Sequence, residues 1–455
     1  MKSTALLATL TISLAGCQTV LPSEKFTAEE SAKVERTEEH NTKVSQRVAE
    51  FYTNNPHYKS VAEAVERASF KSGLYSLEAQ KLLNAAHIQD QLPQITPSLS
   101  LDKNGFGIAR LLVDQILFSN GRLKAGKLTL NAQEAGALAQ YRLEENENVA
   151  RALTTYLDCV RYKKTIEAAN ELIEFYERFG QMAEARVQGG VANRTEVRLF
   201  ELKRAQAQSQ RDEALSELRR AETELALYTE AEISYRDYRR LNFDSQYLDV
   251  NKDTGLLKND PILFTPEFRI ALATLDERIA EHKFAKAEKI PELRLTGGFG
   301  LGSAKGLLSN NSLNFARLTF DSQNSLNWGA DLTMESRQAQ VLAAQAAVDD
   351  RRRQINIALK TQNALIESFS DQLSAKSKIS ELASQRAVSF SEDFLAGAVG
   401  LLEVVSVLET VKSVKLDAIM TEHSLHLTEV EKAAALGVLG PFPVELDSET
   451  QLRRN

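Results

Sequence analysis

Hydrophobic residues recur at steps of three and four positions, with polar residues between them, over a very long stretch that starts at Arg122. No proline interrupts the chain from there to Met182. At 1.5 Å per residue, some sixty residues make a helix of roughly 90 Å, far longer than the helices of ordinary globular domains. Its apolar positions form one stripe, as on a packed helix face: Leu153, Leu157, Val160, Leu172, Phe175, Phe179 and Met182.

A glycine-containing hinge, Val187 to Glu196, follows this stretch and leads into a second amphipathic run. The second run has apolar positions at Val197, Phe200, Leu215, Leu218, Leu225 and Tyr228. Two long helices joined by so short a hinge fold back on each other, so the pattern predicts an antiparallel helical hairpin.

The same order returns about two hundred residues later. Arg337 to Ser391 contains neither proline nor glycine, and a hinge from Phe394 to Val404 leads into a shorter helix. Gly190 aligns with Gly397 and Glu196 with Glu403 without a gap. The chain therefore contains the hairpin twice.

The period changes to two ahead of each hairpin. Ile95 to Leu101 and Gly105 to Phe118, separated by the turn Asp102–Gly105, predict a β-hairpin. In the second copy we expect strands at Leu293–Leu301 and Trp328–Met334, with Gly302–Asn327 as the loop between them. Strands of about ten residues suit a membrane barrel, and four cannot close one alone. The strands therefore predict an oligomer.

The N-terminus is typical of a secretory signal. Lys2 precedes a short apolar core that ends in Leu14-Ala15-Gly16-Cys17, which resembles the lipobox of bacterial lipoproteins. We expect a lipid on Cys17; the alternative is a plain signal peptide with a chance cysteine. Cys159 is expected to be a small buried hydrophobe, without an intrachain disulfide if Cys17 is acylated.

Composition argues against binding to nucleic acid. The 455 residues carry a net charge of -7, which gives no electrostatic reason to bind nucleic acid. Arg351-Arg352-Arg353 follows Asp349-Asp350 and is expected on a solvated helix face.

Candidate chemistry is sparse. Gly298 to Gly302 faintly resembles a nucleotide-binding loop but fits glycine in a barrel strand better. We expect His423 and His426 to be an exposed pair rather than metal ligands. We predict no cofactor, no metal and no enzymatic activity.

These boundaries predict six segments. They are a lipoprotein signal peptide with its lipobox (1–17), an N-terminal tether (18–55), a first hairpin repeat (56–230), an equatorial linker (231–259), a second repeat (260–440) and a C-terminal tail (441–455).

The chain resembles the TolC-like outer membrane efflux (outer membrane factor) family over roughly Asn55 to Gly440. The resemblance rests on Leu92-Pro93-Gln94 before a strand, on Gln115-Ile116-Leu117-Phe118-Ser119-Asn120-Gly121-Arg122 before the first long helix, and on the two hinges. It implies a mainly α fold with a small β part. Duplicated helical hairpins would form an α-barrel, and each copy of a homotrimer would give four strands to a twelve-stranded transmembrane β-barrel.

The resemblance also implies a location and partners. The protein would be lipid-anchored in the outer membrane with a large periplasmic part. It would export substrates delivered by a periplasmic adaptor (membrane fusion) protein and an inner-membrane pump, either ABC-type or proton-driven, in tripartite efflux or type I secretion. Small toxic molecules and an unfolded secreted protein both remain possible cargo.

In the family the periplasmic aperture lies at the hairpin tips. Its acidic position falls on Glu403, and a second acidic position one turn on is Ser406 here. Three symmetry-related Glu403 carboxylates would concentrate cations. The alternative for Glu403 is a helix-start carboxylate favoured by the helix dipole. The family's polar latch positions fall on Thr195 and Glu196, but their partner positions are Val399 and Phe394, which cannot form that latch.

Two further readings compete with an export duct. A lipid-anchored periplasmic coiled-coil adaptor or scaffold should carry one hairpin between β-rich domains, and an α-helical enzyme would need a polar constellation. Two hairpins, each preceded by paired strands, favour the duct. Its adaptor-docking residues are expected at the exposed tips: Gly189, Gly190, Thr195, Glu196, Gly397, Val399 and Gly400.

Overall fold

The computed structural model describes most of the chain between Thr37 and Gly440. The described residues are 37–68, 72–89, 94–101, 107–230, 239–241, 261–289, 292–303, 315–321 and 329–440. Contacts divide the chain into Met1–Asn41 and Thr42–Asn455, and the account below concerns the second unit. The signal peptide with Cys17, most of the expected tether and linker, the turn Asp102–Gly105 and the tail after Gly440 lie outside the described residues.

Four long helices form the two predicted hairpins. The first consists of α5 (Arg122–Gln188) and α6 (Arg194–Thr229), and the second of α8 (Gly329–Leu395) and α9 (Leu401–Ala435). α5 and α8 have 67 residues each, which corresponds to roughly 100 Å. In the part of the chain that the structure describes, no helix combines the length and apolar character needed to cross a membrane.

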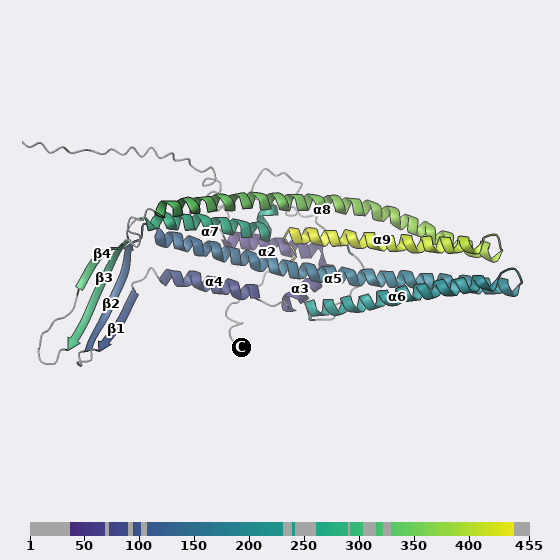
Figure 1. Cartoon of the computed structure of the whole chain (residues 1–455), viewed down its shortest axis with the longest axis horizontal. Helices are drawn as coiled ribbons and strands as arrows, with labels where there is room; N and C mark the ends of the chain where they lie inside the picture. Colours follow the sequence, from purple (N-terminus) through teal and green to yellow (C-terminus); the bar gives the residue numbers. More distant parts are fainter. Residues whose placement is uncertain are drawn as a thin grey trace, which may run out of the picture. The chain divides into compact units, whose positions relative to one another are not determined.

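The helices lie side by side in a row. In the half with the hairpin tips, packing contacts give the order α8, α9, α5, α6 (Figure 1). In the other half the shorter helices α7 (Pro266–Glu288) and α4 (Ser72–Gln89) replace α9 and α6, which gives α8, α7, α5, α4. α5 and α8 run through both halves. The row therefore ends at α8 on one edge and at α6 and α4 on the other.

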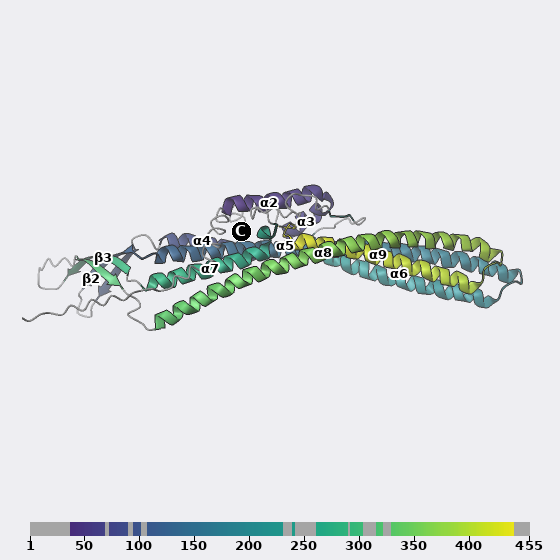
Figure 2. The same cartoon turned by 90° about the horizontal axis from the view of Figure 1, so that it is seen from above.

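The core where the two halves meet is covered by short elements. Figure 2 shows α3 (Pro56–Ala68), and the part of α2 (Thr37–Asn54) from Thr42 onward, against one face of the row. Phe51, Tyr52 and Val61 are buried there in one cluster with the α5 and α9 helices and the 3-10 turn η2 (Pro261–Phe264). The Tyr52 hydroxyl donates to the carbonyl oxygen of Leu439 at 2.6 Å. Because α2 packs in this way, its residues after Thr42 belong to the folded core.

A buried carboxylate, Glu429, organises the polar part of this core. It is 1% exposed, and it accepts hydrogen bonds from the backbone N–H of Leu241 at 3.0 Å and from Nε of Arg240 at 3.1 Å. His426 Nδ1 lies 3.0 Å from the same carboxylate. His423 is buried too, and burial lowers its pKa. The expectation of an exposed histidine pair was wrong, because both side chains are buried: His423 Nε2 lies 3.5 Å from Asp158 of α5, and His426 binds Glu429.

One antiparallel sheet joins the two repeats. Its order is β1 (Gln94–Leu101), β2 (Gly107–Phe118), β3 (Glu292–Ser303) and β4 (Phe315–Asp321). The two middle strands pair across the repeats, with Leu111 opposite Phe299. β1 and β4 each have one strand neighbour among the described residues. The sheet thus ends in two open edges, as the row of helices does.

The first three strands match the prediction, and the fourth does not. Residues 329–334, expected as a strand, are the first turns of α8, and the fourth strand is β4, inside the expected loop. Four alternating residues cannot distinguish the two periods, and Ala330, Leu332 and Met334 are good helix formers next to an Ala-rich helix. Ala316, Leu318 and Phe320 carry the strand alternation that was missed.

The residue pattern at the start of α5 has a structural reason. Asn120 and Gly121 both have positive φ, 47° and 86°, and turn the chain from β2 into the helix. Arg122 then forms an ion pair at 2.6 Å with Glu292, the first residue of β3. The junction of the first repeat is therefore attached to the first residue of the second repeat's strand.

Candidate functional site

The tips of the two hairpins are built in the same way. Gly190 and Gly397 have φ of 75° and 76°, in the left-handed region where a side chain is disfavoured. The N–H of Val191 donates to the oxygen of Arg186 at 2.9 Å, and the N–H of Ala398 to that of Asp393 at 2.9 Å. These bonds form the Schellman motif that ends a helix at glycine. The predicted equivalence of the two hinges is confirmed.

Both helices that leave the tips begin with a glutamate at the third helical position. In α6 the side chain of Asn193 caps the helix by accepting from the N–H of Thr195 at 3.3 Å, and Glu196 follows. In α9 the position of the cap is Gly400, and Oε2 of Glu403 accepts from its N–H at 3.1 Å. The Glu403 side chain is exposed, and Ser406 one turn later is exposed too. Glu403 thus contributes to the helix start and remains accessible.

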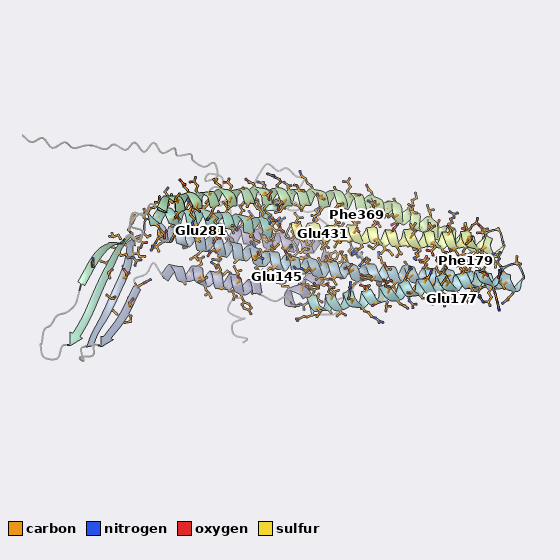
Figure 3. The ribbon with its side chains drawn as sticks, viewed as in Figure 1. Glu145, Glu177, Phe179, Glu281, Phe369 and Glu431 are labelled. Carbon is orange, nitrogen blue, oxygen red and sulfur yellow. The ribbon has the colours of Figure 1, made fainter. Side chains whose placement is uncertain are left out.

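Three phenylalanines connect the two tips within one chain. Phe179 of α5, Phe200 of α6 and Phe394 of α8 are each 0–1% exposed. The ring centroids of Phe179 and Phe394 are 5.8 Å apart, and those of Phe200 and Phe394 are 6.0 Å apart, both edge-on. Phe179 lies near the tip end of α5, as labelled in Figure 3. Edge-on aromatic pairs add about 1 kcal/mol beyond the area they bury, so this cluster fixes the second hairpin on the first.

Arg186, in the last turn of α5, strengthens the same contact. Its guanidinium carbon lies 4.5 Å from the centre of the Phe394 ring, and Nη1 donates to the Phe394 carbonyl oxygen at 3.2 Å. At the expected latch positions, the Thr195 side chain bonds only locally to Asn193, and Val399 packs against the apolar cluster. An aromatic contact therefore stands where the family pattern has a polar latch.

A series of ion pairs continues the connection along α5 and α9. Lys164 binds Glu422 at 2.8 Å, and Lys415 binds Glu171. Nearer the tip, Glu409 accepts from Lys203 of α6 at 2.7 Å. Burial favours the neutral form of Glu409, but the bond to Lys203 and the charges of Lys203 and Lys412 outweigh it and lower its pKa. These ion pairs cross the interface between the two hairpins and would have to break if the hairpins separated.

Large apolar side chains are exposed at both tips. Val191 is 71% exposed at the first tip, and Leu402 and Leu395 are 77% and 55% exposed at the second. Because these side chains flank glycines, which have no side chain of their own, they give the tips an apolar surface. Of the predicted docking residues, Gly189 and Gly190 directly precede Val191, and Gly397 and Gly400 lie between Leu395 and Leu402 in the chain.

Sequence reasoning placed the hinges correctly but missed what connects them. It assigned Phe179 and Phe200 to apolar stripes and treated Phe394 only as a departure from the latch. A phenylalanine within about three turns of each hinge was the available signal. Their meeting at one point depends on the packing of three helices, which periodicity does not give.

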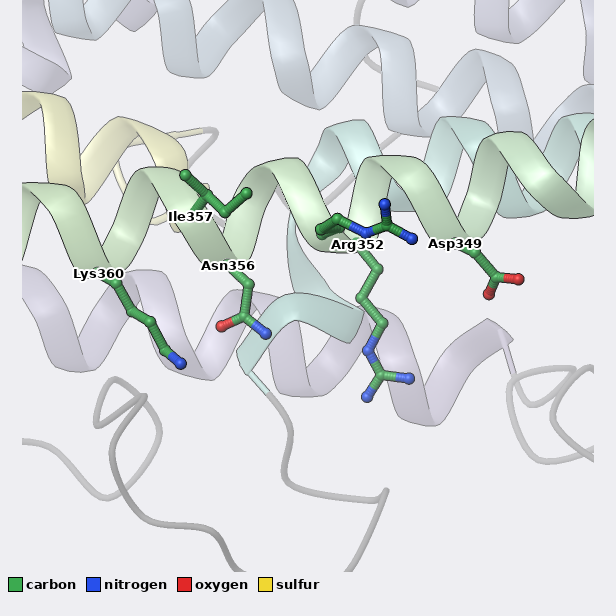
Figure 4. A pocket seen from close by; sticks show the side chains of 6 residues that line it. Asp349, Arg352, Asn356, Ile357 and Lys360 are labelled. Carbon is green, nitrogen blue, oxygen red and sulfur yellow. The ribbon is translucent and has the colours of Figure 1, made fainter.

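An open cleft runs along α8 beside the arginine run that was expected on a solvated helix face. Figure 4 shows that its lining side chains come from one face of that helix; they are Asp349, Arg352, Arg353, Asn356, Ile357 and Lys360. Arg351 beside it pairs with Glu267 of α7 at 3.1 Å. The arginine run is part of a solvated helix face, as predicted.

Cys159 is buried within α5, as expected, and burial raises the pKa of its thiol to about 12.

Known structures show where this fold occurs. The outer-membrane protein VceC from Vibrio cholerae is 12% identical, with a TM-score of 0.72 over 86% of this chain and 98% of VceC. The outer-membrane channel OprN is 16% identical, with a TM-score of 0.71 over 84% of this chain and 90% of OprN. The open MtrE outer-membrane channel of Neisseria gonorrhoeae is 17% identical, with a TM-score of 0.68 over 84% and 88%.

No family model matches the sequence. No curated protein matches it either. The likeness to the solved channels lies at low identity and shows the fold: this chain has the TolC-like fold of outer-membrane factors.

Replacing Phe394 by Ala should detach the second tip from the first. Loss of a fully buried phenyl ring costs about 3 kcal/mol, and here both aromatic pairs and the Arg186 contact go with it. We expect faster amide hydrogen exchange at the end of α8 and the start of α9, measured by mass spectrometry. The matched control is Leu395→Ala, at the exposed neighbouring position, which should leave exchange unchanged. Equal exchange in both variants would contradict the role of the aromatic cluster.

Proposed function

We propose that the chain forms a trimeric outer-membrane channel-tunnel that exports substrates. The observation that carries this proposal is that, among the described residues, the row of helices and the sheet both end in open edges. An open sheet edge presents unpaired backbone N–H and C=O groups, which inside a membrane must be paired. Copies arranged in a ring pair the sheet edges and the helix edges at the same time.

Four strands per copy bear on the number of copies, because one copy cannot close a barrel, and the resemblance implies three copies. A membrane barrel needs at least eight strands, and three copies of β1–β4 make twelve. The same three copies would place the helical rows in a ring that continues the barrel as a tunnel. The similar solved proteins support this reading, since they are outer-membrane channels.

The same proposal implies where the protein lies in the cell and which proteins it binds. The barrel and a lipid on Cys17 would hold the protein in the outer membrane, and the helices would extend into the periplasm. The apolar tips would dock a periplasmic adaptor that connects the tunnel to an inner-membrane pump, either ABC-type or proton-driven. The coiled-coil adaptor reading is less favoured, because it leaves the four-stranded sheet with two open edges.

Electron microscopy of the detergent-extracted full-length protein tests the assembly. We expect threefold particles in which a helical tube continues a short barrel, because only a closed ring satisfies both kinds of edge. Monomeric or compact particles would favour the adaptor instead.

A charge at either tip should abolish export. Val191→Glu or Ala398→Arg puts a charge into the apolar tip surface, where a docking partner would have to desolvate it. The measurement is accumulation of a fluorescent efflux dye in cells that contain the matching adaptor and pump but no other outer-membrane channel. Trimers should form normally. Asn170→Glu, at an exposed position of α5 about 27 Å before its tip end, is the control. Normal export in the tip variants would refute docking at this surface.

Glu403→Gln should reduce the cation preference of single channels severalfold. Glutamine keeps an oxygen that can accept from the N–H of Gly400, so the helix start is retained while the three carboxylates of the proposed ring lose their charge. Reversal potentials in planar bilayers measure the effect, together with block by divalent cations. Glu184→Gln, exposed on α5, serves as the control. Unchanged selectivity and block would leave Glu403 as a helix cap alone.

A further inference from the structure

The charged residues of the four described strands share one face of the sheet. Side chains along a strand alternate between the two faces, and residues directly opposite each other on paired strands lie on the same face. The register places Asp114 opposite Thr296, and Thr296 opposite Arg317. By this alternation, one face, called the charged face below, holds every charged position of β1–β4: Arg110, Asp114, Glu292, Arg294, Arg317 and Asp321.

The opposite face of the sheet is mainly apolar. It carries Ile95, Leu111, Val113, Leu293 and Leu295. Ile95 is 61% exposed and Leu111 is 40% exposed, so the described part of the chain does not bury this face. Strands of a membrane barrel alternate in the same way, with apolar side chains toward lipid and polar ones toward the lumen. In the proposed barrel the charged face therefore lines the lumen.

The charges nearest the helices are paired with one another. Arg122, the first residue of α5, lies 2.6 Å from Glu292. Arg294 bridges Glu292 at 3.4 Å and Asp114 at 3.0 Å. The Thr296 hydroxyl donates to the same Asp114 carboxylate at 3.5 Å. Because this chain of contacts balances two arginines against two carboxylates, it adds little net charge to the lumen.

Arg317 of β4 stands apart from this chain of contacts. The residue opposite it is the uncharged Thr296. The Arg317 side chain is exposed, and among the described side chains no carboxylate pairs with it. Arg110 lies further from the helices, opposite Gly300, whereas the acidic positions lie level with Arg317 or nearer to the helices. Positive charge therefore prevails on the part of the charged face that is farthest from the helices.

Rotational symmetry turns this single side chain into a ring. In the proposed trimer, three Arg317 side chains would lie at one height around the lumen. A ring of like charges attracts ions of opposite sign and repels ions of its own sign. Salt limits the range of this field to about 10 Å at an ionic strength of about 0.1 M and to about 3 Å at about 1 M. The ring therefore acts most strongly at low salt.

We propose that Arg317 determines selectivity in the outer part of the barrel lumen, where it favours anionic groups of solutes and opposes the passage of cations. This role rests on the proposed trimeric channel. It gives that channel a second charged zone, opposite in sign to the proposed Glu403 ring at the tips. The anions concerned carry carboxylate or phosphate groups, whose oxygens match the paired N–H donors of a guanidinium.

Removing the charge of Arg317 tests this role. Arg317→Gln should raise the cation-to-anion permeability ratio of single channels severalfold, because the lumen loses three positive charges. Reversal potentials under a potassium chloride gradient in planar bilayers measure the ratio. Arg317→Lys retains the charge and should keep the ratio of the parent protein. The difference between the two variants should shrink as the salt concentration rises from about 0.1 M to about 1 M.

Chemical restoration of the charge provides a second test at the same position. In Arg317→Cys channels, a trimethylammonium methanethiosulfonate reagent should restore the ratio of the parent protein, and a sulfonate reagent should raise the ratio beyond that of Arg317→Gln. Leu295→Cys, on the apolar face, is the control and should respond to neither reagent. Cys159 does not compete, because it is buried and burial raises its pKa to about 12.

Asp114→Asn should shift the ratio in the opposite direction. Asparagine can still accept from the Thr296 hydroxyl, but Arg294 loses the charge of its partner on β2. The lumen thereby gains net positive charge, and we expect a lower cation-to-anion permeability ratio in the same bilayer measurement.

The outcomes separate the role of Arg317 from the channel itself. Conducting channels whose permeability ratio changes neither in Arg317→Gln nor with either thiol reagent would overturn the role of Arg317 and leave the proposed channel in place. A parent protein that forms no channels in bilayers would overturn both. A rise in Arg317→Gln, a fall in Asp114→Asn and restoration by the cationic reagent together support the proposal.

Discussion

A row of helices that is one helix thick cannot bury all of its own edges, and this constraint governs the structure. Within the row that the described residues form, each interior helix has a row neighbour on both sides, whereas α8 on one edge and α6 and α4 on the other have a row neighbour on one side. The four-stranded sheet has the same property at β1 and β4. Apolar side chains that remain exposed on α8 and α6 are consistent with a chain that completes its packing only beside other copies.

The duplication explains how one chain can supply a matched set of edges. Each repeat contributes two strands and one hairpin, and the repeats meet through the β2–β3 pairing and the α5–α9 contacts. The ion pair of Arg122 with Glu292 joins the first repeat to the second. The buried carboxylate of Glu429 joins α9 to the segment that follows α6. Specific polar contacts thus fix the relative position of parts whose apolar packing alone would permit sliding.

At the tips, the contacts that hold the two hairpins together differ from the turns that end their helices. Schellman turns at Gly190 and Gly397 end α5 and α8 identically, but the aromatic cluster around Phe394 connects the hairpins asymmetrically, with Arg186 contributed by α5 alone. An apolar contact of this kind is insensitive to salt, unlike the Lys164–Glu422 and Lys203–Glu409 pairs further along the same interface. Any movement of the second hairpin must separate both kinds of contact.

The sequence alone determined the long helices, the two glycine hinges, their equivalence and three of the four strands. These features depend on local periodicity and on the conformational freedom of glycine, which can be identified within a short window. The tertiary structure decided where the fourth strand lies, because a four-residue alternation before an Ala-rich helix fits two periods equally well. It also decided that Arg240 and Leu241 bind the buried Glu429 and that Phe394 meets Phe179 and Phe200. These are relations between residues far apart in the chain, and only the packing of the helices brings them to one place.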